Sequence, residues 1–200
     1  MKLRSCRISL PVVTVAALLT VGGCGVGVGE KADKQQPAGV PLAPATNLTM
    51  QEAAERADAM LDATMSAIRP EVQWAHGYNS AGSCDVTRHR VVMTIISKER
   101  LGSFLGIVQR SWEKSGYEIK AVNKDKEFPA LYAQSKDGFG IDLTIGAKRQ
   151  ASFRVSTPCV KKSEVSDPTT SPNGPSYKNV DPIPRPNVRS EFWSSDKPAK

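Results

Sequence analysis

A short apolar run near the start of the chain sets the first limit on the fold. Residues 8–23 are mostly apolar and follow a basic start, but a proline and two threonines interrupt them. A membrane-spanning helix needs about 20 apolar residues in a row, so this run is too short and too broken. A basic start followed by a short apolar stretch is typical of a secretory signal peptide. We therefore expect residues 1–23 to be removed and the folded domain to form from the rest.

Cys24 directly follows this run and ends the string Leu-Leu-Thr-Val-Gly-Gly-Cys. The string resembles a bacterial lipobox: Val21 and Gly23 fit its aliphatic and small positions, whereas Gly22 stands where alanine, serine or threonine is commoner. The resemblance implies that Cys24 becomes the first mature residue and carries acyl chains. Two such chains suffice for stable membrane anchoring. The alternative is an ordinary secretory signal cut near Gly22, with Cys24 incidental.

The charge of the chain argues against nucleic acid as a partner. The formal net charge is +7, and removal of the signal with Lys2, Arg4 and Arg7 lowers it to +4. A charge of this size is ordinary for an envelope protein and is weak evidence for nucleic-acid binding. It fits a mild attraction to anionic lipid headgroups or wall polymers. We expect no nucleic-acid partner.

The cysteines predict one disulfide. Cys6 leaves with the signal and Cys24 takes the lipid, so Cys84 and Cys159 remain. An even pair in an exported protein predicts a disulfide. It would close a loop of about 75 residues, for which chain-entropy estimates give about 4 kcal/mol of stabilisation. Two free thiols or a metal pair are the alternatives, but no C-x-x-C spacing supports a metal.

Composition divides the remaining chain into three parts. Residues 24–46 contain a glycine-rich stretch and three prolines, which predicts a flexible tether. Residues 47–160 carry the apolar periodicity of a folded domain. Residues 161–200 are rich in proline and serine without apolar periodicity, which predicts a disordered tail. Phe192 and Trp193 stand out in this tail: they dock on the domain or a partner, or are a solvated pair of no consequence.

The domain is predicted to begin with an amphipathic helix. Thr49 and Glu52 form a capping box, and apolar residues then recur at steps of three and four up to Arg69, before Pro70. The polar face of this helix carries Glu55, Arg56, Asp58 and Asp62. A second helix is predicted from Ser97, as N-cap, to Gly116, which is well placed to end it.

Six further segments are predicted to be strands. They span residues 72–78, 86–96, 117–122, 130–135, 139–145 and 151–157. Lys136-Asp137-Gly138 is a strong hairpin turn, and the short links between the last four strands favour an antiparallel meander. Both helices need a sheet face on which to bury their apolar stripes. We predict an α+β fold, a single antiparallel sheet with two helices on one face, in the order α-β-β-α-β-β-β-β.

Three arginines form the first candidate binding surface. Arg88 and Arg90 alternate on one strand, and Arg154 lies on another. Together they would form a basic patch for a wall polymer or a lipid headgroup, to which Phe192 and Trp193 add an aromatic contact. Alternating charges on a solvated strand face explain the same pattern.

The two histidines, His76 and His89, are candidates for catalysis. Glu71 and Asp85 lie near them in sequence. Zinc sites need three or four ligands at fixed spacing, and no such motif is present, so we expect no metal and no cofactor. An enzyme would have to be a small envelope hydrolase in which one histidine lies in a cleft with a shifted pKa. We expect a non-catalytic protein.

Aromatic residues suggest a second alternative, a carrier of a lipid or small hydrophobic ligand. The seven aromatics that would line a cavity between helices and sheet are Trp74, Tyr78, Trp112, Tyr117, Tyr132, Phe139 and Phe153. Such cavities are common in α+β folds. The simpler interpretation is that these residues form an ordinary core.

With its lipobox, tether, cysteine pair and proline-rich tail, the chain resembles the small secreted lipoproteins of high-GC Gram-positive bacteria. The resemblance is specific only over residues 1–24. It implies a lipid-anchored protein on the outer face of the cytoplasmic membrane and assigns no active-site residue. The prediction from the sequence is therefore a non-catalytic binding or envelope-assembly protein, whose partners are the membrane and a wall polymer or envelope protein.

Overall fold

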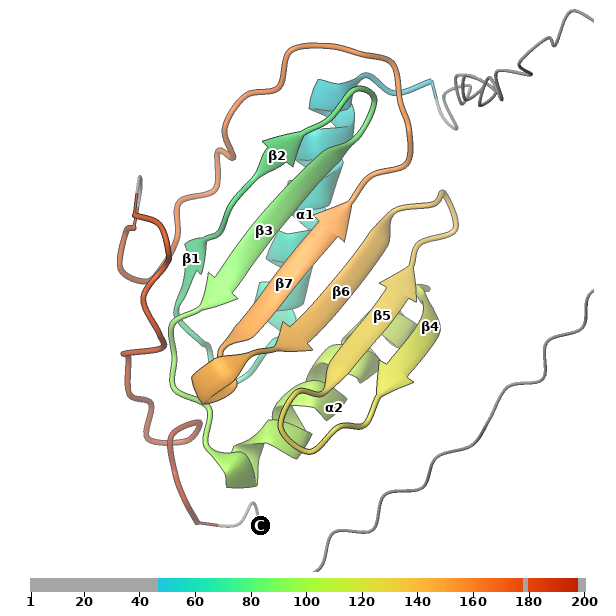
Figure 1. The fold of residues 1–200 in the computed structure, drawn as a ribbon. Coiled ribbons are helices and arrows are strands. Elements are labelled where there is room, and N and C mark those ends of the chain that lie inside the picture. Colours follow the sequence, from blue (N-terminus) through green and yellow to red (C-terminus); the bar gives the residue numbers. More distant parts are fainter. Residues whose placement is uncertain (1–46, 178–179, 198–200) are drawn as a thin grey trace, which may run out of the picture. The chain divides into compact units, whose positions relative to one another are not determined.

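The structure, a computed structural model, describes residues 47–177 and 180–197. The predicted signal peptide, the predicted lipidation site at Cys24 and the predicted tether lie outside the described residues. The described chain has an α+β fold with two α-helices and a seven-stranded antiparallel sheet (Figure 1). This confirms the predicted fold class.

The elements follow one another as predicted, with one addition. They are α1 (Met50–Ala67), β1 (Trp74–His76), β2 (Ser80–Ala81), β3 (Val86–Val92), α2 (Lys98–Lys114), β4 (Glu118–Asn123), β5 (Ala130–Gln134), β6 (Gly140–Ile145), the 3₁₀ turn η1 (Ala147–Arg149) and β7 (Ala151–Ser156). The addition is β2, which lies between the strands predicted at residues 72–78 and 86–96. These two residues form a strand because they pair with the start of β3. A two-residue strand is too short to show an alternating pattern in the sequence.

The sheet order is β1-β3-β7-β6-β5-β4, with β2 pairing to β3 beside β1. Strands β4 to β7 form the predicted antiparallel meander. β7 then inserts next to β3, which joins the two parts of the sheet. The turn between β5 and β6 contains Gly138 at φ +90°, a left-handed conformation that glycine adopts without strain.

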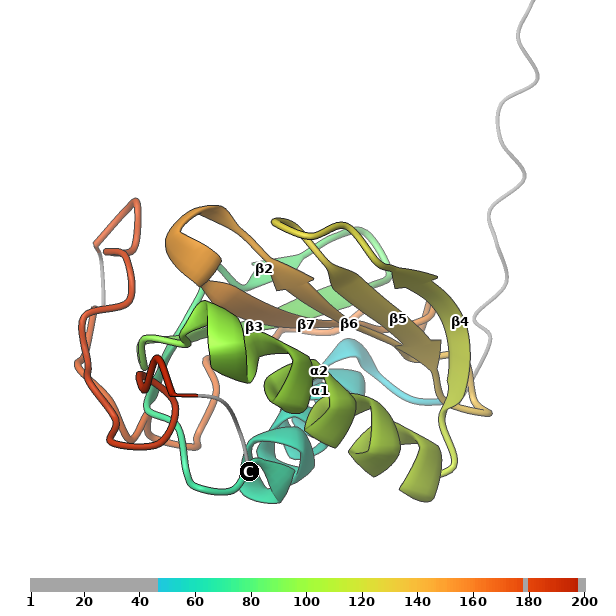
Figure 2. The same cartoon turned by 90° about the horizontal axis from the view of Figure 1, so that it is seen from below.

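Both helices lie on the same face of the sheet (Figure 2). The Thr49–Glu52 capping box is present at the start of α1, and the Ser97 side chain caps α2. Gly116 follows α2 with φ +78°, as expected of a residue that ends a helix. The core between the helices and the sheet contains Phe104, Trp112 and Phe153, which are all nearly or fully inaccessible to solvent. We refer to this side of the sheet as the helix face and to the other as the open face.

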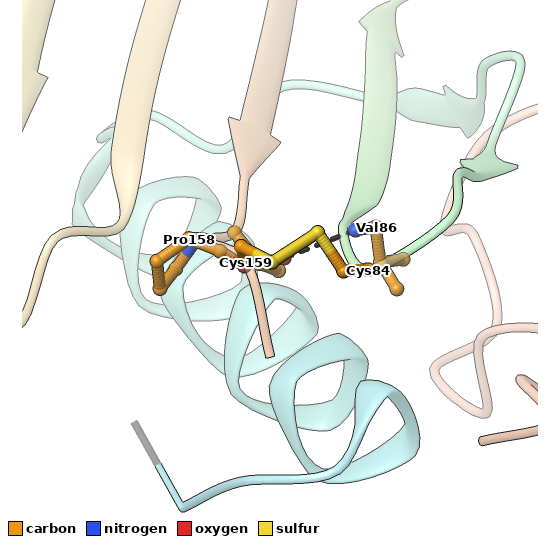
Figure 3. Close-up of a disulfide and its surroundings, with 5 residues drawn as sticks. Cys84, Val86, Pro158 and Cys159 are labelled. Atoms are coloured by element: carbon orange, nitrogen blue, oxygen red, sulfur yellow. Dashed lines mark hydrogen bonds between the residues drawn. A yellow bond between two sulfur atoms is a disulfide. The ribbon is translucent and has the colours of Figure 1, made fainter. Parts of the chain in front are cut away.

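The predicted disulfide joins Cys84 to Cys159 (Figure 3). Cys84 precedes β3 and Cys159 follows β7, which are adjacent antiparallel strands, so the two Cα atoms lie 4.8 Å apart. Val86 and Thr157 add a pair of hydrogen bonds beside the bridge. The disulfide therefore closes the end of the sheet at which β3 begins.

The segment after β7 differs from the prediction of a disordered tail. Residues 161–177 and 180–197 run along the domain and down its β1 edge (Figure 1). The Ile95 amide donates to the Val188 carbonyl at 2.8 Å, and the Gly174 amide donates to the Trp74 carbonyl at 3.1 Å. Isolated apolar residues anchor an extended chain without any period of their own, which is why composition alone did not indicate this packing.

Candidate functional site

Strand β3 separates two chemically different surfaces. Successive side chains of a strand point to opposite faces, so Arg88 and Arg90 enter the helix face while Thr87 and His89 lie on the open face. Arg88 is 4% exposed and Arg90 is 1% exposed. The sequence therefore identified the strand that carries the candidate residues, but it did not show which face of that strand is accessible to a ligand.

Arg88 and Arg90 pair with two carboxylates of α1, of which Asp58 is mostly buried and Asp62 is partly exposed. Arg88 Nε lies 3.2 Å from Asp58 Oδ2, and Arg90 Nη2 lies 2.6 Å from Asp62 Oδ1. Burial raises the pKa of Asp58, and the nearby Arg88 and Arg90 oppose that rise. The Arg90 guanidinium also stacks over the Trp74 ring at 4.0 Å from its centroid. The predicted basic patch is therefore wrong for these two arginines, because both are buried and each is paired with a carboxylate.

The matched spacings explain this pairing. Asp58 and Asp62 are four residues apart on a helix, a rise of about 6 Å. Arg88 and Arg90 are two residues apart on a strand, a distance of about 6.7 Å. The two pairs consequently come into register where α1 crosses β3. This match of spacings is present in the sequence. The sequence analysis placed Asp58 and Asp62 on the polar face of the helix and did not use it.

Phe192 and Trp193 dock on the domain itself. Trp193 is 0% exposed, packs edge-to-face on Phe104 at 5.5 Å, and donates its Nε1 hydrogen to the Pro70 carbonyl at 2.6 Å. Phe192 is half-buried and stacks with the Arg100 guanidinium. Trp193 is therefore part of the core and not an exposed contact for a partner.

The predicted aromatic groove between helices and sheet is divided between core and surface. Trp74, Trp112, Phe139 and Phe153 are buried in the helix-face core. Tyr78 and Tyr132, in contrast, are 81% and 39% exposed. The aromatics of the core pack on each other, with Phe104 and Phe153 at 6.1 Å and Trp112 and Phe153 at 6.5 Å between ring centroids.

A row of polar side chains crosses the open face of the sheet. Cross-strand pairing places Tyr132 opposite Asp142, Asp142 opposite Arg154, and Arg154 opposite His89. Arg154 Nε donates to Asp142 Oδ2 at 3.0 Å. Burial raises the pKa of Asp142, and the hydrogen bond from Arg154 opposes that rise. Of the three predicted arginines, only Arg154 contributes to an accessible surface.

His89 occupies the end of this row. Its Nε2 atom lies 2.5 Å from the Ser152 hydroxyl, and its ring lies against Gly77, where a Cβ atom would come within 2.2 Å of Nδ1. Burial, with a smaller contribution from Arg154, lowers the pKa of His89 to about 4. The imidazole is therefore neutral at pH 7. A side chain at position 77 would displace the ring.

His76 lies on the opposite face of the sheet. Its ring contacts Trp74 edge-to-face at 5.2 Å, and its Nε2 atom lies 2.9 Å from the Thr170 carbonyl of the C-terminal segment. The two histidines therefore belong to separate environments and cannot act on one ligand.

Two depressions of about 390 Å³ each lie side by side on the open face. The first is lined by Lys120, Tyr132, Ala133, Gln134, Gly140, Ile141, Asp142 and Ser156. The second is lined by Tyr78, Ser80, Thr87, His89, Asp142, Thr144, Ser152, Arg154 and Ser156. Because Asp142 and Ser156 line both, the depressions join across the strands. We refer to them together as the open-face groove.

The C-terminal segment leaves this groove free while it covers the apolar end of the same face. Ala75, Val91 and Met93 form a small cluster there, on which Tyr177, Ile183 and Val188 pack. Among the described residues, the part of the open face that stays uncovered is the polar one. Asp142, Ser152 and Ser156 were not recognised from the sequence, because their importance arises from cross-strand neighbours distant in the chain.

Within residues 47–177 and 180–197, no cluster of three or more histidine, cysteine or carboxylate side chains is arranged to hold a metal ion. None of the helices in the described part of the chain has the length and apolar character needed to cross a membrane.

Comparisons with known proteins do not name a family for this chain. No family model and no curated protein matches it. A DUF4853 family protein from Actinomyces odontolyticus is similar over 68% of this chain and 82% of its own, with 13% identity and a TM-score of 0.35. A glyoxylase/bleomycin resistance protein/dioxygenase domain from Frankia is similar over 52% of this chain and 98% of its own, with 9% identity and a TM-score of 0.26.

Proposed function

We propose that this protein is a non-catalytic binding protein of the cell envelope, anchored by acyl chains on Cys24 to the outer face of the cytoplasmic membrane. The observation that carries the binding role is the asymmetry of the sheet. One face is closed by two helices, whereas the other carries a polar groove that no part of the described chain covers. The binding partner is a component of the envelope, such as a wall polymer.

The disulfide supports a location outside the cytoplasm. Cys84 and Cys159 are bonded across adjacent strands, and disulfides persist in oxidising compartments but are rare in the cytosol. The lipobox-like string that ends at Cys24 supports the anchor, and residues 24–46 would then serve as the tether between membrane and domain.

The anchor is tested by mass spectrometry of the protein extracted from its own membranes. We expect an N-terminal Cys24 that carries acyl chains, and a total mass two hydrogens lower than that of the reduced protein. A Cys24→Ser variant should be found without acyl chains and released from the membrane fraction. An unacylated wild-type protein would overturn the anchor but not the binding role of the groove.

The groove is tested with a variant that fills it. Ser156 lines both depressions, so Ser156→Trp should obstruct them together. Glu113→Trp, on the exposed side of α2, is the matched control. Each full-length mature protein is mixed with detergent-extracted envelopes of the producing bacterium and sedimented. We expect the wild type and Glu113→Trp to sediment with the envelopes and Ser156→Trp to remain in solution; equal sedimentation of all three would refute the proposal.

A second candidate, a small hydrolase, is favoured by one observation. His89 is neutral at pH 7 and lies 2.5 Å from the Ser152 hydroxyl within the groove, as a nucleophile and its general base would. Asp142, the carboxylate of the same row, is bonded to Arg154 and does not orient the histidine. A fluorophosphonate probe distinguishes the candidates: adduct formation on Ser152 that His89→Ala abolishes would favour the hydrolase, and no adduct is expected of a binding protein.

A further inference from the structure

The shape of the open-face groove favours an elongated ligand. The row from Tyr132 on β5 to His89 on β3 crosses four strands, and neighbouring strands are about 4.8 Å apart. The row therefore extends for about 14 Å. Since the two depressions share Asp142 and Ser156 at their junction, one continuous chain can occupy both.

The charges of the groove compensate one another. Arg154 is bonded to Asp142, Lys120 is bonded to Glu118 at 2.6 Å, and His89 carries no charge at pH 7. Sites for phosphate or carboxylate groups rely on arginine or lysine side chains that are free to form charge-assisted hydrogen bonds. The groove thus lacks the excess positive charge that an anionic polymer would require.

Apart from the charged and histidine side chains, the polar lining groups are mainly hydroxyls, together with the Gln134 amide, and two tyrosines also line the groove. Five hydroxyl side chains line the second depression or its junction with the first: Ser80, Thr87, Thr144, Ser152 and Ser156. A hydroxyl both donates and accepts hydrogen bonds, so it complements a ligand whose own polar groups are hydroxyls. Tyr132 lines one depression and Tyr78 the other. Each offers an exposed flat ring with a polar tip, which suits the apolar face of a sugar ring.

We infer that the open-face groove binds a neutral glycan chain laid across the strands, with one tyrosine stacked on a sugar in each depression. This inference rests on the proposed binding role of the open face and names the chemical class of the ligand. For a protein anchored in the envelope, the glycan strands of the cell wall are the source of such a chain.

The experiment measures binding of uncharged hexasaccharides to the full-length mature protein by NMR titration. The probes are chitohexaose, cellohexaose, mannohexaose and arabinohexaose, each with its disaccharide, and the anionic comparison is a heparin hexasaccharide. We expect at least one neutral hexasaccharide to shift the amides of β3, β6 and β7, with a dissociation constant of about 0.1–1 mM. Its disaccharide, which fills only one depression, should bind about tenfold more weakly.

Three variants locate the contact. Tyr78→Ala and Tyr132→Ala should each weaken hexasaccharide binding about three- to tenfold, the range expected for the loss of one ring contact. Phe128→Ala is the matched control, because Phe128 is an exposed aromatic outside both depressions. It should bind like the wild type. Equal losses in all three variants would overturn the inference.

The outcomes separate this inference from the proposed function. Preferential binding of heparin at the same amides, or no binding of any neutral probe, would overturn the glycan inference. If Ser156→Trp still abolished sedimentation with envelopes, the binding role would stand and the ligand class alone would be wrong. If the envelopes were also not bound, both proposals would fail.

Discussion

The two faces of the sheet use their polar residues in opposite ways. On the helix face, Arg88 and Arg90 are buried and form ion pairs with Asp58 and Asp62 of α1. On the open face, the Asp142–Arg154 pair and His89 lie along an accessible groove. Although β3 contributes side chains to both faces, its two arginines belong to the helix face, where they serve the fold. Charge along a strand is therefore a poor guide to function until its facing partners are known.

The largest expected effect lies in the helix-face core. Trp193→Ala removes a fully buried ring and its hydrogen bond to Pro70, and such truncations cost about 3–5 kcal/mol. Urea unfolding of the purified protein measures this loss. Phe128→Ala, at an exposed ring, should change stability by less than about 0.5 kcal/mol. Similar midpoints for the two variants would show that the C-terminal segment does not complete the core.

The buried Arg88–Asp58 ion pair provides the next test of the difference between the two faces. Asp58→Asn leaves Arg88 charged in the interior without a carboxylate partner, which should cost about 3 kcal/mol. Replacing both partners, with Asp58→Leu and Arg88→Met, should recover most of that loss, since apolar pairs of similar volume often match a buried ion pair. Thermal and urea unfolding of the single and double variants check this. A double variant less stable than the single one would mean that the pair contributes net stability.

On the open face, we expect His89 to make the stability of the fold depend on pH. Its pKa falls from 6.5 to about 4 on folding, so between these values the unfolded chain binds the proton more readily than the folded one. Stability is therefore lost as pH falls from 6.5 to about 4, by about 3 kcal/mol over the full window. Urea unfolding across this range should show a shallower slope in His89→Gln than in the wild type. Parallel pH profiles would contradict the assignment.

The smallest effect on stability is expected at the groove tyrosines. Tyr78 is 81% exposed, so Tyr78→Ala should alter unfolding free energy by less than about 0.5 kcal/mol while weakening glycan binding. Urea unfolding and NMR titration of the same sample measure the two effects. A large loss of stability in Tyr78→Ala would show that the open face, like the helix face, serves the fold.

Local order in this protein was determined by the sequence itself. The Thr49–Glu52 capping box, the Ser97 cap and the glycine after α2 each act on neighbours within a few residues, so their patterns indicated the helices and their ends. The short links after α2 likewise indicated the meander. The pairing of Cys84 with Cys159 followed from counting cysteines, because two remained once Cys6 was given to the predicted signal peptide and Cys24 to the predicted lipid site.

Only the tertiary structure decided which surface is available for function. Pairing between distant strands placed His89, Arg154 and Asp142 in one row, and no local pattern contains that information. Docking of α1 buried Arg88 and Arg90, and docking of the C-terminal segment buried Trp193. The physical reason is common to all three: burial and charge pairing depend on contacts between segments far apart in the chain, whereas a sequence pattern reports only on near neighbours.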